Sequence, residues 1–226
     1  MRFYVRARPV GIALVGWSYP SMFDIDVPFM RKIVKMLKPS SDRDYDMKVY
    51  IPGSSFKGSL RSSVSRIASS YGFTSCGYIE PELIRIAHQR SGICDVCKIF
   101  GYPGSNTSSL IHVSDLDPVN SIRTFNVTRT KLEDGSLKVF EHALYTYEHI
   151  DDQAEFRGYI EVESKNPDIL GLVLLGLAEL RLGRMGRSSI FDLRIEESRE
   201  LRDLLSKTKW IYLLEDLERW LWIGVT

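Results

Sequence analysis

The chain has 226 residues and a net charge of +1, with 44% hydrophobic and 26% charged residues. This composition excludes a disordered, collagen-like or disulfide-scaffold protein, and the length suits one large domain or one domain with insertions. The charge is uneven, because the first 72 residues carry a net charge of +7. No apolar run approaches the roughly 18 residues of a membrane-spanning helix, and Met1–Arg8 is too charged for an export signal. We therefore expect a cytoplasmic protein without a membrane partner.

The first half of the chain alternates between regular and irregular segments. Its pattern predicts a strand over 2–15, a short helix over 29–37 and a polar loop over 40–46. The sharpest break is Ile51-Pro52-Gly53-Ser54-Ser55-Phe56-Lys57-Gly58. It predicts a helix that is capped by Ser54 or Ser55 and ended by Gly72. A cysteine-bearing, irregular segment over 73–105 follows, with a predicted helix over 81–88.

The second half adds the remaining strands and a buried helix. Strands are predicted over 110–114, 156–162 and 190–195, and nearly all of 168–180 is apolar, as in a buried helix. A long polar insertion carries the hairpin-turn signal Asp134-Gly135, and an amphipathic helix or helix pair is expected over 201–222. The order strand, helix, strands, helix, strand predicts an α+β fold with a ferredoxin-like, RRM-like core. We expect a single domain over 1–226, with insertions at about 17–50, 73–109 and 119–153.

All three cysteines lie in the second of these insertions. Cys94 and Cys97 form a C-x-x-C pair, and Cys76 and His88 lie upstream of it. Three thiolates and one imidazole can complete a closed, tetrahedral zinc site, which indicates a structural metal. The alternatives are three buried cysteines with a surface histidine, or a redox-active C-x-x-C pair, for which the surrounding strand-to-helix context is missing.

Two glycine-containing loops are candidate phosphate-binding sites. The turn before the first long helix offers free backbone N–H groups, hydroxyls and cations, from Ser54, Ser55, Lys57 and Arg61. The loop after the buried helix combines glycines that permit close approach with guanidinium groups, at Gly183, Arg184, Gly186 and Arg187. A capped helix with a solvated basic face and an ordinary helix-ending turn are the alternative interpretations.

Taken together, these motifs resemble the RAMP superfamily of CRISPR-associated proteins. The resemblance rests on the Pro-Gly-Ser-Ser turn at 52–55, the sequence Cys94-x-x-Cys97-x-x-Phe100-Gly101 and the late glycine-arginine loop, which has fewer glycines than is usual. The small backbone subunits of type III effector complexes are the most similar members. The resemblance implies binding of guide RNA and complementary target RNA, assembly with copies of itself and other subunits, and a β-hairpin thumb bearing Arg123 and Arg129.

The resemblance also implies a catalytic residue. Members that cut target RNA carry an aspartate in a loop before the Pro-Gly-Ser-Ser turn, and Asp26-Val27-Pro28 is similar to that setting, whereas Asp24 is not followed by proline in the same register. Asp26 is therefore the expected catalytic residue of a metal-dependent endoribonuclease, with Mg²⁺ or Mn²⁺ as its divalent cation. A structural RNA-binding subunit that does not cut is the alternative. A guide-processing ribonuclease is less favoured, because those enzymes often use a histidine near the first helix and the first histidine here is His88.

Overall fold

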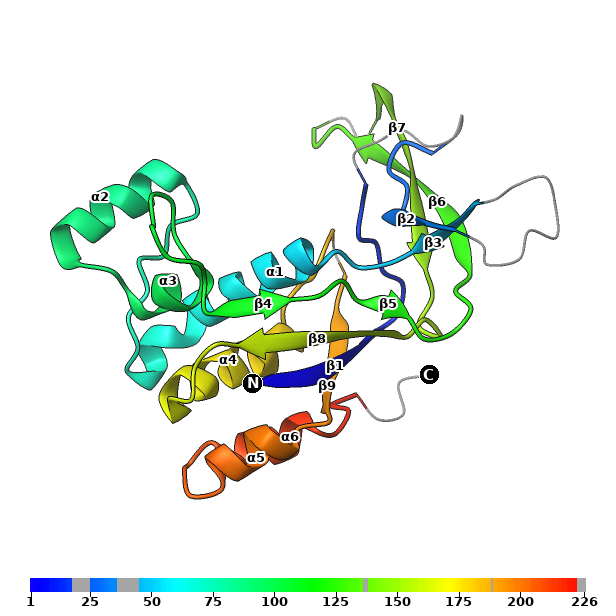
Figure 1. The fold of residues 1–226 in the computed structure, drawn as a ribbon. Coiled ribbons are helices and arrows are strands. Elements are labelled where there is room, and N and C mark those ends of the chain that lie inside the picture. Colours follow the sequence, from blue (N-terminus) through cyan, green and yellow to red (C-terminus); the bar gives the residue numbers. More distant parts are fainter. Residues whose placement is uncertain (18–24, 36–44, 136–137, 188, 223–226) are drawn as a thin grey trace.

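An antiparallel sheet forms the centre of the molecule (Figure 1). The computed structural model describes residues 1–17, 25–35, 45–135, 138–187 and 189–222. The sheet has the order β4-β8-β1-β9, and β5 also pairs with β8. The strands are β1 (Arg2–Pro9), β4 (Ile111–Val113), β5 (Asp117–Pro118), β8 (Phe156–Val162) and β9 (Phe191–Glu196). All of these pairs are antiparallel, and β1 lies between β8 and β9.

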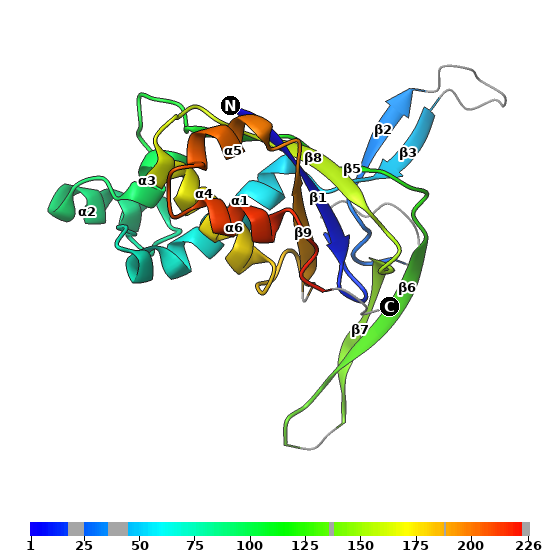
Figure 2. The ribbon, with the colours of Figure 1, turned by 90° about the horizontal axis from the view of Figure 1, so that it is seen from below.

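Two helices cover one face of this sheet (Figure 2). They are α1 (Gly53–Ile67) and α4 (Pro167–Leu180), and alternate residues of β1 and β8 are buried on the same side. The helices approach closely because Gly176 has no side chain: a Cβ there would lie 2.2 Å from Cγ2 of Val64. This arrangement of strands and helices is the expected ferredoxin-like, RRM-like core of an α+β fold.

Additional elements project from the two ends of the core (Figures 1 and 2). At one end lie the short 3₁₀ helix η1 (Ala68–Tyr71), α2 (Pro81–Ser91) and α3 (Asp95–Phe100). At the other end lie two hairpins, one of β2 (Arg31–Lys35) and β3 (Tyr45–Val49), the other of β6 (Thr124–Leu132) and β7 (Val139–Ile150). The C-terminal region forms α5 (Arg199–Leu205) and α6 (Ile211–Leu217). No helix in the described part of the chain is long and apolar enough to span a bilayer.

Several predicted boundaries need correction. The helix expected over 29–37 is wrong, because residues 31–35 pair with β3 and the β-branched Ile33 and Val34 suit a strand. The first strand ends at Pro9 rather than residue 15. Neither serine caps α1, which begins at Gly53 after Pro52. The Gly53 N–H instead donates to Oδ1 of Asp115, 62 residues away in sequence, so local sequence did not reveal this cap.

Candidate functional site

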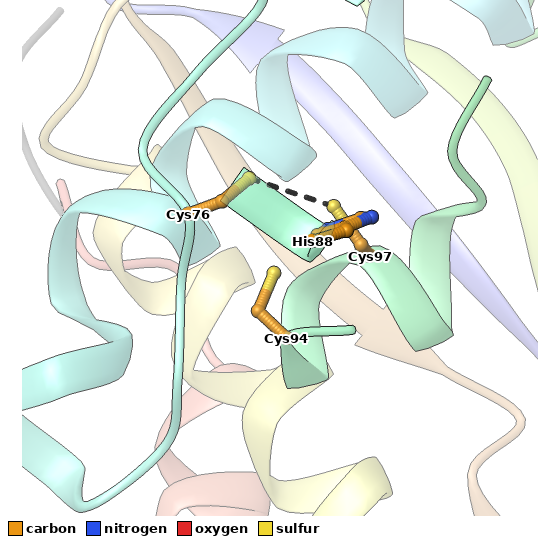
Figure 3. A group of neighbouring side chains, drawn as sticks. All are labelled: Cys76, His88, Cys94 and Cys97. Carbon is orange, nitrogen blue, oxygen red and sulfur yellow. Dashed lines mark hydrogen bonds between the residues drawn. The ribbon is translucent and has the colours of Figure 1, made fainter. Parts of the chain in front are cut away.

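The four predicted metal ligands lie together (Figure 3). Cys76 follows η1, His88 belongs to α2, and Cys94 and Cys97 lie at the start and in the middle of α3. One ligand atom from each residue lies within 4.8 Å of all the others. The sulfur atoms of Cys76 and Cys97 are 3.7 Å apart. A tetrahedral zinc ion with Zn–S bonds of about 2.3 Å places its sulfur ligands about 3.8 Å apart, so this spacing fits zinc.

The chemistry of the donor atoms also fits a metal. Nε2 of His88 is buried without a hydrogen-bond partner, which is costly unless another group takes up its lone pair or proton. Hydrogen bonding from the Cys97 thiol lowers the pKa of Cys94 to about 4, so this thiol readily becomes a thiolate. The hydrogen bond with Cys94 and then burial raise the pKa of Cys97, so this thiol keeps its proton until a cation displaces it. The cluster can therefore hold a metal such as zinc, with no position left open for a substrate.

The predicted phosphate-binding residues of α1 point in two directions. Ser54 and Ser55 are exposed in the first turn. Lys57 points into the protein, where its Nζ donates to Oγ of Ser109 at 2.6 Å and to the carbonyl of Ile111 at 2.9 Å. Burial, and then the nearby charge of Arg61, lower the pKa of Lys57. The serines thus face solvent, whereas the lysine fastens α1 to the segment that leads into β4.

Arg61 also has partners inside the protein. Its two terminal nitrogens donate to the carbonyl of Gly101 at 3.0 Å and to Sγ of Cys97 at 3.2 Å. One of these partners, Cys97, is a candidate metal ligand, and the other, Gly101, ends the helix that carries it. The structure therefore places Arg61 against the metal cluster, which the sequence did not predict.

The glycine-arginine loop packs against the segment that follows β1, at Leu14. Gly186 has a left-handed backbone (φ +82°), and a Cβ there would lie 2.3 Å from the carbonyl oxygen of Leu14. The same carbonyl accepts a hydrogen bond from the Arg187 N–H at 3.2 Å. Gly183 lies against the side chain of Arg66, and Arg184 is exposed. Only glycine fits at position 186, so the loop presents Arg187 in a defined place.

Arg187 meets one face of the hairpin formed by β6 and β7. The strand register places Phe125 opposite His149, Val127 opposite Tyr147, and Arg129 opposite Tyr145. Directly opposed residues share a face, so one side of the hairpin is aromatic and basic. Nη1 of Arg187 donates to the hydroxyl of Tyr147 at 3.1 Å. Together they line a hollow of about 290 Å³, whose walls are Leu14, Arg129, Thr130, Lys131, Tyr145, Tyr147, His149 and Arg187.

Sequence reasoning found Arg129 and Arg187 of this hollow but not Lys131. It also missed the aromatic residues Tyr145, Tyr147 and His149, whose period-two spacing is the signal for one strand face. Burial lowers the pKa of His149, so its imidazole is neutral near pH 7. Arg123 is exposed just before β6 and does not line the hollow.

Asp26 lies on the outer edge of β7. Its N–H donates to the carbonyl of Thr146 at 3.0 Å, and its Oδ2 accepts from the Thr146 N–H at 2.6 Å. Val27 continues the contact through a parallel bridge to Tyr147. The carboxylate is exposed and held beside the strand that carries the aromatic residues. Asp24 lies outside the described residues.

A buried ion pair secures this loop to the hairpin. Glu148 of β7 binds both terminal nitrogens of Arg31 and accepts the N–H of Phe29 at 2.9 Å. Burial alone would raise the pKa of Glu148, but the hydrogen bonds from Arg31 and Phe29 outweigh it and lower the pKa. The carboxylate is therefore ionised and fixes Phe29 and Arg31, which closely follow Asp26 in the chain.

The fold and these sites define a ferredoxin-like protein with an insertion that can hold a metal and a basic, aromatic hairpin. The sequence profile of the RAMP superfamily matches residues 36–224, so the chain belongs to this superfamily of CRISPR-associated, RNA-binding proteins. No curated protein matches the sequence.

Proposed function

We propose that this chain is a cytoplasmic, guide-RNA-binding backbone subunit of a type III CRISPR interference complex that cleaves complementary target RNA at regular intervals. The observation that carries the proposal is the placement of Asp26, exposed and hydrogen-bonded to Thr146 at the edge of β7. In this proposal the chain is one domain, the insertion over 119–153 is the thumb, and copies of the subunit assemble with one another and with other effector subunits.

RNA would lie along the hollow between the thumb and the glycine-arginine loop. Arg129 and Arg187 supply positive charge there, Tyr145 and Tyr147 supply flat surfaces for bases, and the buried His149 packs against Tyr147. Aromatic stacking combined with cations binds single strands with little regard to sequence. Arg123, Arg184 and the exposed first turn of α1, with Ser54 and Ser55, are further contacts for the sugar-phosphate backbone. Such a protein binds the RNA backbone and bases without regard to sequence, and base pairing between guide and target provides the sequence recognition.

Asp26 would act on the target strand held against the thumb. Oδ2 is engaged by Thr146, so we assign Oδ1 to the reaction. This oxygen would hold a divalent cation, Mg²⁺ or Mn²⁺, or orient the ribose 2′-hydroxyl for attack on the adjacent phosphate. The cation would supply charge stabilisation for the departing oxygen. Because the loop is fixed by Glu148, the carboxylate would keep one position relative to the RNA.

The alternative is a structural backbone subunit that binds RNA and does not cut it. Both proposals use the same RNA contacts, so Asp26 alone separates them. A guide-processing ribonuclease is disfavoured by a specific observation. His88, the first histidine in the sequence, lies in the candidate metal cluster, where its imidazole would be a metal ligand rather than a proton donor.

The test is target cleavage by the assembled complex containing wild-type, Asp26→Ala or Asp26→Asn subunits, with end-labelled complementary RNA and Mg²⁺. We expect evenly spaced cuts from the wild type and loss of these cuts, by at least about 100-fold, in both variants. Asparagine can still accept the Thr146 hydrogen bond, so its inactivity would exclude simple loop displacement. Asp152→Ala, in a turn where the side chain is half-buried, is the matched control and should cut normally.

Guide RNA content of each complex is measured in parallel. Unchanged cutting by Asp26→Ala would remove the catalytic assignment. Intact complexes that never cut, wild type included, would favour the structural alternative.

A further inference from the structure

Arg61 connects helix α1 to the candidate metal centre by a two-pronged contact. Nη2 donates to Sγ of Cys97 at 3.2 Å, and Nη1 donates to the carbonyl of Gly101 at 3.0 Å. Cys97 is a buried residue of α3, and Gly101 is the residue at which this helix ends. The guanidinium therefore holds the metal-binding helix at two points, from an element outside the metal-binding insertion.

The net charge of a zinc-loaded site explains why the positively charged Arg61 would lie beside it. A Zn²⁺ ion with three thiolates and one neutral imidazole carries one negative charge in excess. Cys94 and Cys97 are buried, so water offers little screening of that charge. A guanidinium hydrogen-bonded to a thiolate sulfur supplies the compensating positive charge at short range.

Neighbouring contacts show that this face of α1 supports the insertion. Lys57, one helical turn before Arg61, fastens Ser109 and Ile111 at the end of the insertion. Residues four apart share a helix face, so both cations point toward the insertion. Arg66 lies further along α1, is exposed, and pairs with Glu179 of α4.

We infer that Arg61 is a positioning residue of the metal centre: it neutralises the excess charge of the zinc–thiolate cluster and fixes the orientation of Cys97. This inference does not depend on the proposed function. This role replaces the predicted role of Arg61 as a contact for an RNA phosphate. Both terminal nitrogens of the guanidinium donate hydrogen bonds within the protein. Lysine cannot reproduce the contact, since its single ammonium lacks the planar fork.

The test compares zinc affinity of the full chain and its variants, by competition with a chromogenic chelator. Arg61→Gln should weaken zinc binding about 10- to 100-fold, the usual loss for outer partners of a metal ligand. Arg61→Lys keeps the charge and should show a smaller loss. Arg66→Gln, which removes a cation from the same helix without contact to the cluster, should bind zinc like the wild type.

The Co²⁺ absorption spectrum and the RNA affinity of the same variants are measured in addition to zinc affinity. The absorption spectrum of the Co²⁺-substituted Arg61→Gln protein should remain that of a four-coordinate site, which shows that all four ligands still bind. If Arg61→Gln does not fold, the zinc affinity of Arg61→Lys tests the inference instead. Weaker zinc binding by Arg61→Lys than by the wild type supports the inference, and equal affinity overturns it. Wild-type zinc affinity in a folded Arg61→Gln protein, with weakened RNA binding, would also overturn it and return Arg61 to the RNA interface.

Discussion

Tyr147 is the residue at which the parts of the proposed RNA interface meet. Its hydroxyl accepts a hydrogen bond from Arg187, and its backbone bridges to Val27, next to Asp26. Its ring lies 6.4 Å from that of His149 and 6.5 Å from that of Tyr145, measured between centroids. The tyrosine therefore links the glycine-arginine loop, the Asp26 loop and the aromatic face of the hairpin.

Replacement of Tyr147 tests whether this face binds bases. Tyr147→Leu should weaken binding of single-stranded RNA by about 1–3 kcal/mol, or roughly 5- to 150-fold, because a stacking surface is lost. Tyr147→Phe keeps the ring and should bind nearly as well as the wild type. The measurement is fluorescence anisotropy with a labelled oligonucleotide at fixed salt.

The matched control for this comparison is Tyr212→Leu, because Tyr212 is an exposed tyrosine of α6 at the other side of the molecule. Equal affinity of Tyr147→Leu and the wild type would show that bases do not stack on this face.

At the scale of elements, the hairpin of β6 and β7 is positioned by contacts along β7. Residues 26–29 run along its outer edge, and Ala13 pairs with Ile150 at its base. An isolated two-stranded hairpin is only marginally stable in water, so these contacts are needed to hold it in one place. The buried pair of Glu148 and Arg31 is the strongest of them, since both ends are charged and hydrogen-bonded.

Glu148→Gln should therefore destabilise the protein in a pH-dependent way. The folded pKa of Glu148 is lowered relative to the unfolded value of about 4.3, so its stabilisation is complete above that pH. At pH 7 we expect a loss of about 3 kcal/mol, the cost of breaking a buried pair. As the pH falls through the lowered folded pKa, the wild type loses the same interaction and the difference should shrink.

Thermal unfolding of both proteins at pH 7 and at pH 3 provides the measurement. Glu163→Gln, at an exposed glutamate, should change stability by less than about 0.5 kcal/mol at either pH. A difference between Glu148→Gln and the wild type that does not change with pH would contradict the role assigned to the ionised carboxylate.

At the scale of the whole molecule, local patterns predicted the core and missed the long-range contacts. The strand over 156–162 and the helix over 168–180 were predicted almost residue for residue, because their apolar periodicity reflects burial. The four residues chosen as metal ligands from their type and spacing do lie together, since residue type and spacing nearly define such a site. The cap of α1 by Asp115 and the direction of Arg61 were not predicted, because both depend on partners far away in sequence.

The metal-binding insertion shares the hydrophobic core of the whole chain. Ile84 of α2 and Val96, Ile99 and Phe100 of α3 are buried in the same cluster as Phe56 of α1. The insertion is therefore not an independently folded appendage. Metal binding that orders α2 and α3 should stabilise the core as well, since the two regions share buried surface.

Metal removal should consequently lower the stability of the entire protein. We expect about one zinc per chain by elemental analysis. With free zinc about 1,000-fold above its Kd, binding contributes about 4 kcal/mol, or about 8–16 °C in Tm for a chain of this size. A chelator should lower the Tm of the wild type toward that of Cys97→Ser and leave Cys97→Ser unchanged, because that variant lacks a ligand. A zinc-free protein with an unchanged, single unfolding transition would show that the four side chains pack without a metal.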